Sequence, residues 1–398
     1  MMTPRNSIAA LKEEITAERR TLHENPQTAY EETFAAELIA KKLDEWGVKY
    51  EAGWAGGTGI VATIEGENTS SGRAIALRAD IDALDVIEKS GQPWASKTAG
   101  KMHACGHDGH TAMLLGAAKY LQETRNFNGT VHLVFQPAEE GGKGADRMIE
   151  EGLFKKYPVE GVYGLHNWPG LPRGEFATNP GPIMAAVDSF DITITGKGAH
   201  AAMPNQGIDP AVITAQLIMA LQTLVSRESD PVDAAVVSVT NVQIGTGAFN
   251  VIGDTAKLTG SVRSFKPETR DMLERRIEEL SHHICLGFGA TVEVDYMRGS
   301  DATINTPGEA AFCVEVANDL FGPDKTHGDI DPCMGAEDFG AMLMEVPGCY
   351  VWLGQGEPDQ PDSPHNNGLH HPAYDFNDEI IPIGIEFWVS LVEKKLAA

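Results

Sequence analysis

The pattern of apolar and polar residues along the chain predicts helices in some stretches and strands in others. Residues 7–24 and 33–46 place apolar side chains three and four positions apart, which predicts two amphipathic helices. Short runs that favour β-strands then alternate with stretches of helical length. The runs lie at 58–66, 74–80, 129–137 and 159–167, and the helical stretches lie at 111–123 and 145–154. Strands separated by helices are typical of an α/β fold with a mostly parallel sheet and helices on both faces.

This alternation changes near residue 187. The following patterns predict elements in the order β-α-β-β-α-β, at 187–196, 209–227, 234–245, 254–265, 267–287 and 290–297. That order is the ferredoxin-like α+β arrangement, which forms a small self-contained domain. The βα pattern returns after about residue 300. We therefore predict a discontinuous domain at 1–186 and 298–398 that carries the chemistry, with a second domain inserted at 187–297.

Composition narrows the possible partners. Two domains suit a chain of 398 residues, and 31 Lys+Arg against 57 Asp+Glu give a formal net charge of -26. This charge would repel nucleic acid and anionic membranes, so we expect neither as a partner. The five cysteines are widely spread and form no CxxC pair, which favours a reducing, cytoplasmic location. No apolar stretch reaches the ~20 residues that span a bilayer, so a soluble protein is expected.

The densest group of metal-binding side chains is HACGHDGH at 103–110. Other metal-binding or acidic residues follow predicted strands: Asp80 and Asp82, the pair Glu139-Glu140, and His166. Ligands of open α/β sheets bind at the carboxyl ends of the strands, so these groups are expected along one edge. The pattern predicts a metal site there.

Spacing suggests how two of these residues share an ion. Cys105 and His107 are two positions apart, and in an extended segment such residues point to the same side. A ligand set of His, Cys and carboxylate suits Zn, Mn, Co or Ni without choosing among them. Neighbouring side chains diverge, so either Glu139 or Glu140 can bind metal while the other acts as a general base.

Three further histidines are ambiguous. His103, His110 and His371 are equally compatible with surface or hydrogen-bonded residues and with ligands. No GxSxG elbow occurs in the sequence, which argues against a serine hydrolase.

Nine motifs, in order along nearly the whole chain, resemble a known family. They are RRTLHENPQTAYEE, LRADIDAL, KMHACGHDGHTAMLLGAA, FQPAEEGGKGADRMIEEG, GLHNWPGLPRG, GKGAHAAMPNQGIDP, NVIGDTAKLTGSVRSF, MGAEDFG and LHHPAYDFND. Together they resemble the metal-dependent aminoacylase and carboxypeptidase family. The branch is that of bacterial hippurate hydrolases, N-acyl-amino-acid amidohydrolases and plant indole-acetyl-amino-acid hydrolases.

The resemblance implies a site with two divalent metal ions in the catalytic domain. It also implies that the inserted domain is a lid that closes over substrate and makes the dimer contact. Matched motif by motif, it implies Glu139 as the base, and as metal ligands Cys105, His107, Glu140, His166 and His370. His371, the neighbour of His370, receives no role.

Further roles are implied for residues around the metals. His200 resembles the histidine that hydrogen-bonds the developing oxyanion, frequently across the dimer. Asn250, Arg263 and Glu337 resemble residues that bind substrate. In the wider family the first strand motif is His-x-Asp, whereas this chain has Asp80-Ile81-Asp82, so Asp82 is a candidate to orient a ligand.

The function implied is hydrolysis of the amide bond of an N-acyl amino acid to a carboxylic acid and a free amino acid. The alternatives are a dipeptidase or carboxypeptidase using the same metal site, or a non-catalytic metal- or peptide-binding relative. A homodimer or homotetramer acting on a small-molecule substrate is expected.

Overall fold

The computed structural model describes residues 4–397, so residues 1–3 and 398 of the expected catalytic domain lie outside the described residues. The chain divides into two compact units. Unit 1 comprises the residues up to Ile183, Thr303–Pro332 and the residues from Asp338 onward. Unit 2 comprises Met184–Ala302 and Cys333–Glu337. The sequence placed the corresponding boundaries after residues 186 and 297.

Unit 1 is built on an eight-stranded sheet in the order β1-β2-β4-β3-β5-β16-β6-β15. The strands are β1 (Lys49–Trp54), β2 (Gly59–Glu65), β3 (Ala74–Asp80), β4 (Thr130–Gln136), β5 (Val162–Pro172), β6 (Phe176–Ala177), β15 (Thr326–His327) and β16 (Gly348–Gly356). The central strands β4, β3, β5 and β16 pair in parallel, and β1 and β2 add an antiparallel edge. A two-residue pairing of β7 (Pro182–Met184) with β14 (Thr303–Ile304) stands apart. The expected mostly parallel sheet is confirmed.

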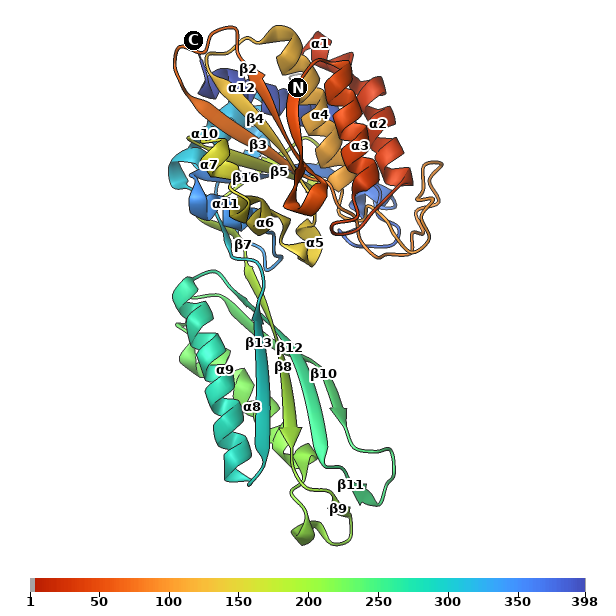
Figure 1. Ribbon diagram of the computed structural model, residues 1–398, viewed down its shortest axis with the longest axis vertical. Helices are drawn as coiled ribbons and strands as arrows, with labels where there is room; N and C mark the ends of the chain where they lie inside the picture. The colour runs from red at the N-terminus through yellow and green to blue at the C-terminus, as the bar shows by residue number, and fades with distance from the viewer. Residues whose placement is uncertain (1–3, 398) are drawn as a thin grey trace. The chain divides into compact units, whose positions relative to one another are not determined.

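Helices flank this sheet (Figure 1). The helices α2, α4 and α12 pack against one another, and α6 packs against α11, which also contacts β5 and β16. The helices are α1 (Asn6–Ala9), α2 (Lys12–Glu24), α3 (Thr33–Glu45), α4 (His107–Thr124), α5 (Glu139–Gly142), α6 (Gly144–Glu150), α7 (Leu153–Lys156), α10 (Pro307–Phe321), α11 (Phe339–Glu345) and α12 (Ile381–Lys395). Because helices cover both faces of the sheet, β3 is buried at every position after Ala74.

Unit 2 has the elements of the ferredoxin-like order. They are β8 (Ala186–Thr195), α8 (Pro210–Thr223), β10 (Ala235–Ile244), β12 (Thr255–Ser264), α9 (Pro267–Gly287) and β13 (Thr291–Arg298). The strands form an antiparallel sheet in the order β10-β12-β8-β13. Residues of β8 are alternately buried, as expected when helices cover one face only. The expected ferredoxin-like domain is confirmed.

A small ribbon extends unit 2 at one end of this sheet. It pairs β9 (Ala199–His200) with β11 (Val251–Ile252), and Figure 1 shows both beyond the ends of β8 and β12. The segment after β8 and the segment before β12 supply these two strands, so the ribbon lies where β8 ends and β12 begins.

Two helices differ from the sequence prediction. The expected helix 7–24 is interrupted, since α1 ends at Ala9 and α2 begins at Lys12. The expected helix 209–227 is α-helical only to Thr223, and residues 224–228 continue as a wider π turn closed by the bond from Ser229 N to Leu224 O.

His132 makes part of the stability of unit 1 depend on pH. Its ring packs 4.9 Å from that of Tyr157, and its Nδ1 lies 3.0 Å from the Thr63 hydroxyl. Burial lowers the pKa of His132 from 6.5 to about 4, so the unfolded chain binds a proton that the folded protein does not. The free energy of unfolding should therefore fall as the pH drops from 6.5 to 4, by at most ~3 kcal/mol for this group.

The test is urea unfolding of the wild type and of His132→Gln at several pH values in that window. The variant should lose stability less steeply on acidification than the wild type. Identical pH slopes in the two proteins would contradict the assignment.

Candidate metal and catalytic site

The candidate site lies where strands β3 and β4 of unit 1 end, beside the middle of the neighbouring strand β5. Strand β3 ends at Asp80, β4 leads into Glu139 and Glu140, and His166 is the fifth residue of β5. The three strands are adjacent and parallel, and Arg78 of β3 pairs with Gly164 of β5, so Asp80 and His166, two residues further along each strand, lie level with each other. The sheet therefore brings together side chains that are far apart in sequence.

Cys105 and His107 reach this edge through a turn. Gly106 has φ +98°, and His107 is already the first residue of α4. The expectation of an extended segment is therefore wrong, because the glycine turn sets the two side chains on one site. A Cβ at position 106 would collide with the side chains of Asn167 and Tyr374, so the position requires glycine in both conformation and space.

The five predicted ligands form two groups that share Cys105. One group is Cys105, His107 and His166, the other is Cys105, Glu140 and His370, and the donor atoms within each group lie within 4.8 Å of one another. Cys105 Sγ is 3.4 Å from His166 Nε2, and Glu140 Oε1 is 3.1 Å from His370 Nε2. Two sets of three donors with a shared sulfur match the donor chemistry of a dinuclear site.

His107 carries the clearest sign of a missing partner. Its Nε2 is buried and makes no hydrogen bond among the described residues, and Asp80 Oδ2 lies 3.7 Å from it, although a buried polar atom is costly to leave without a hydrogen bond. Its Nδ1 lies 3.0 Å from the backbone oxygen and 3.1 Å from Oδ1 of Asp82. Asp82 Oδ2 also accepts a bond of 2.9 Å from the backbone N–H of Glu140. The residues therefore fit a metal ion at Nε2, with Asp82 orienting the ring.

The electrostatics of the site also suit a cation. Burial acts to lower the pKa of His107, but the carboxylates of Asp80, Asp82 and Glu140 raise it to about 10. Burial and the neighbouring His110 lower the pKa of His166, which keeps that ring neutral and its lone pair available. Net negative surroundings and a neutral donor are the conditions that a divalent ion requires.

A second polar network lies beside the first. His110 Nδ1 is 2.6 Å from Asp80 Oδ1, and its Nε2 is 2.7 Å from Asn167 Oδ1. Asp80, His107 and His110 could in principle hold an ion. However, both nitrogens of His110 are engaged in hydrogen bonds, and Asp80 Oδ2 accepts a bond of 2.8 Å from Arg78.

The three ambiguous histidines have different surroundings. His110 and His103 are buried, and burial lowers the pKa of His103 to about 3, whereas His371 is exposed. The hydrogen bonds of His110 with Asp80 and Asn167 were not predicted from the sequence. The only available signal was that His107 and His110 are three residues apart on one helix face.

The other predicted residues lie in unit 2. His200, in β9, and Asn250 line one pocket of about 490 Å³. Arg263 lies in β12, where its Nε donates to the backbone oxygen of Met334 at 3.2 Å. Glu337 is buried at the end of the segment Cys333–Glu337.

Within unit 2, His200 and Arg263 are far apart. The ribbon that holds His200 adjoins Thr255, at the start of β12, whereas Arg263 is the ninth residue of β12 and pairs with Val187 at the start of β8. The eight residue-to-residue steps of strand from Thr255 to Arg263 span about 26 Å at ~3.3 Å per step. One copy of unit 2 therefore does not present both side chains to the same small molecule.

Comparison with known proteins identifies the family. Residues 76–394 match Peptidase family M20/M25/M40. The chain therefore belongs to this family, and it is an amidohydrolase of the hippurate hydrolase type. The resemblance drawn from the nine motifs is confirmed.

Individual relatives agree with this assignment. The chain is 38% identical to a hippurate hydrolase of Campylobacter jejuni, with 98% of each chain covered. It is 37% identical to an N-acetylcysteine deacetylase of Bacillus subtilis, with 94% of each covered. The structure of the Bacillus subtilis YXEP protein, a dinuclear metal binding peptidase, matches with a TM-score of 0.82 at 34% identity, covering 98% of this chain and 99% of the other.

Among residues 4–397, no helix is both long and apolar enough to cross a membrane.

Proposed function

We propose that the protein hydrolyses N-acyl amino acids to a carboxylic acid and a free amino acid, using two divalent metal ions. The observation that carries this proposal is the pair of donor groups sharing Cys105, beside the acidic pair Glu139-Glu140. The relatives that act on hippurate and on N-acetylcysteine support the substrate class.

The ligands proposed are Cys105, His107, Glu140, His166 and His370, with Mn, Zn, Co or Ni as the metal. When bound, such ions lower the pKa of a coordinated water and polarise the amide carbonyl. Asp82 holds the ring of His107 and the backbone of Glu140 in place.

Glu139 is proposed as the general base. One of its carboxylate oxygens lies within 4.8 Å of donor atoms of His107 and Glu140, so it borders the ligand set. It accepts the proton of the attacking water and delivers it to the leaving amine nitrogen. His200 donates a hydrogen bond to the carbonyl oxygen as negative charge develops there. Arg263 pairs with the free carboxylate of the amino acid, and Asn250 and Glu337 complete substrate binding.

Unit 2 is proposed to act as the lid and as the dimer contact, with His200 and Asn250 of one copy serving the site of the other. The separation of about 26 Å between the two ends of β12 supports this arrangement, since Arg263 and His200 must reach one substrate from different copies. Val212 and Met219 on α8 are 49% and 70% exposed and line a surface pocket of about 610 Å³. An exposed apolar patch of this kind is typical of an interface.

Mixed dimers test the shared site. His200→Ala and Glu139→Gln should each be nearly inactive alone, whereas co-expressed and purified through two different tags they should recover activity. If the two variants pair at random, half of the dimers are hybrids, and each hybrid has one intact site out of two. About a quarter of the wild-type rate is therefore expected before the hybrids are purified. No gain over the separate variants would contradict the shared site.

A substrate panel tests the reaction itself. Hippurate, acetyl-amino acids and dipeptides would be compared by kcat/KM with the protein loaded with Mn, Co, Ni or Zn. The proposal predicts that the acyl-amino acids are preferred. Preference for dipeptides would indicate a peptidase, and no amide hydrolysis with any metal would refute the proposal.

The cytoplasm is the proposed location. All five cysteines have free thiols, and four of them are buried. Unpaired cysteines are typical of a reducing compartment.

A further inference from the structure

The N-terminal motif RRTLHENPQTAYEE has no part in the mechanism above, although several of its charged side chains are buried. Arg19 and His23 on α2, and Glu32 just before α3, each have 0% exposed surface. They also precede the segment 76–394 that matches the family. Buried charged groups are costly unless they are paired, so their partners indicate what they do.

Arg19 contacts three carboxylates of unit 1. Its Nε lies 2.9 Å from Oδ2 of Asp108, its Nη1 lies 3.5 Å from Oδ1 of Asp378, and its Nη2 lies 3.6 Å from Oδ1 of Asp375. The centre of its guanidinium also lies 5.4 Å from the ring centroid of Phe376. These partners come from two chain segments that are more than 250 residues apart.

Both segments carry proposed metal ligands. Asp108 directly follows His107 in the segment that begins with Cys105. Asp375 and Asp378 follow His370 in LHHPAYDFND, a segment without helix or strand up to Asn377 in which His370 itself has φ +66°. A segment held by no regular secondary structure needs side-chain contacts to fix its position.

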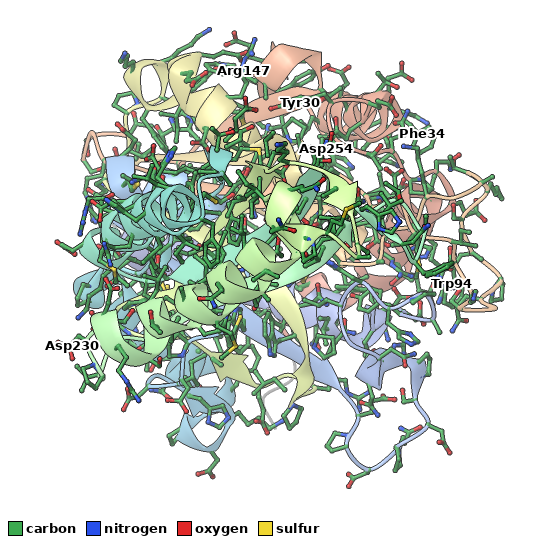
Figure 2. The ribbon with its side chains drawn as sticks, turned by 90° about the horizontal axis from the view of Figure 1, so that it is seen from below. Tyr30, Phe34, Trp94, Arg147, Asp230 and Asp254 are labelled. Atoms are coloured by element: carbon green, nitrogen blue, oxygen red, sulfur yellow. The ribbon has the colours of Figure 1, made fainter. Side chains whose placement is uncertain are left out.

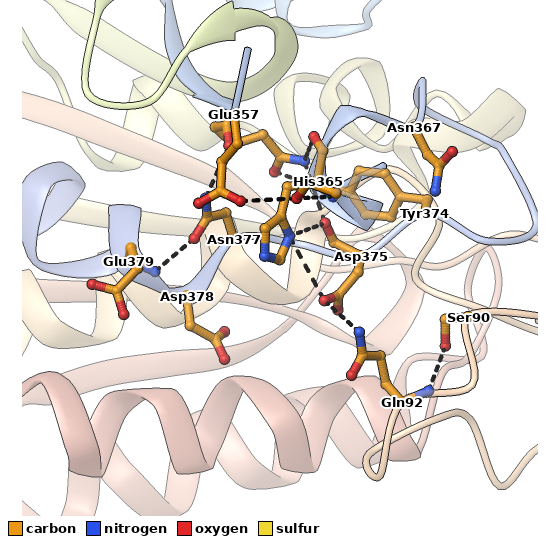
Figure 3. Close-up of polar contacts among 12 residues, drawn as sticks. Ser90, Gln92, Glu357, His365, Asn367, Tyr374, Asp375, Asn377, Asp378 and Glu379 are labelled. Carbon is orange, nitrogen blue, oxygen red and sulfur yellow. Dashed lines mark hydrogen bonds and ion pairs between the residues drawn. The ribbon is translucent and has the colours of Figure 1, made fainter. Parts of the chain in front are cut away.

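Further contacts fix the same carboxylates. His23 Nδ1 is 2.8 Å from Asp108 Oδ2, the oxygen that Arg19 also contacts. Asp375 accepts bonds from Gln92 Nε2 at 3.1 Å and from Trp94 Nε1 at 3.3 Å. Figure 3 shows Asp375 between Gln92 and His365. The Arg19 ion pairs are therefore part of a buried cluster of charged and polar groups rather than isolated surface pairs.

We propose that Arg19 is a positioning residue of the metal centre. It holds the segment of Cys105 and His107 at a fixed position relative to the segment of His370, so that donors from both can close around the ions. This inference rests on the proposed function. A planar guanidinium can contact three carboxylates at once, whereas the single ammonium of lysine is a compact point charge.

The test compares Arg19→Lys with a matched control, Arg20→Lys. Arg20 pairs with Asp378 at 2.8 Å and lies over the ring of Trp94, labelled in Figure 2, but its side chain is 41% exposed. Metal affinity would be measured on each metal-free, folded protein by competition with a chelator, using Zn²⁺ and Co²⁺. The Cys105 thiolate-to-cobalt absorption band gives an independent readout of ligand geometry.

Arg19→Lys should weaken metal binding about 10- to 100-fold and shift the cobalt band, as expected when support for a ligand is lost. Arg20→Lys should change the affinity by less than about twofold. If Arg19→Lys does not fold, the same titration is made on Asp375→Asn, which should also bind metal at least about 10-fold more weakly than the wild type. Wild-type affinity in either folded variant would overturn the inference while leaving the proposed function intact. Failure of the wild type to bind metal would overturn both.

Discussion

Glu139→Gln is expected to lower kcat by about 10²–10⁴-fold while both metal ions stay bound, because a general base contributes a factor of that size. Glutamine keeps the shape of the side chain but cannot accept the proton of water at neutral pH. The predicted ligand beside it, Glu140, is unchanged, as is its backbone bond to Asp82. Steady-state kinetics on hippurate and elemental analysis of the same preparation check both halves of this prediction.

The matched control is Glu150→Gln, which makes the same substitution at an exposed position of α6. It should leave kcat and metal content unchanged. A near-normal rate in Glu139→Gln would exclude this residue as the base, and loss of metal would show that it is a ligand instead.

Cys105→Ala is expected to have the second large effect, because Cys105 is the donor common to both groups of ligands. Alanine leaves each group with two of its three donors, so we expect fewer than two ions per chain after dialysis. Hydrolysis should fall at least about 100-fold with the loss of metal, since the metals activate the water and the carbonyl.

Cys333→Ala provides the control. Cys333 lies in unit 2, is partly exposed and belongs to neither group of ligands. It should retain metal and activity. Unchanged metal content in Cys105→Ala by elemental analysis would remove Cys105 from the ligand set.

Local sequence patterns predicted most elements of both units. Strand 74–80 and helix 267–287 were predicted to the residue, because each has an uninterrupted apolar period and clear ends. The start of α4 was not predicted, because its first turn, HDGH, has polar residues where apolar residues are expected. These polar residues are buried because they belong to the candidate site, and a prediction based on apolar spacing does not detect buried polar residues.

The candidate site was predictable where chemistry coincides with a strand end. Asp80, Glu139 and His166 follow from the rule that ligands bind at the carboxyl ends of parallel strands. Arg19 was not predictable in this way, because its partners are 89, 356 and 359 residues away and only the fold brings them together. The distance between His200 and Arg263 likewise required the register of β8 and β12.

The most direct test of the dinuclear site is a titration of metal-stripped protein with Mn²⁺ or Zn²⁺, with bound metal and hippurate hydrolysis measured in the same samples. We expect negligible hydrolysis without metal and full activity once two ions are bound per chain. Full activity of the metal-stripped protein, or full activity with a single ion bound per chain, would contradict the dinuclear site.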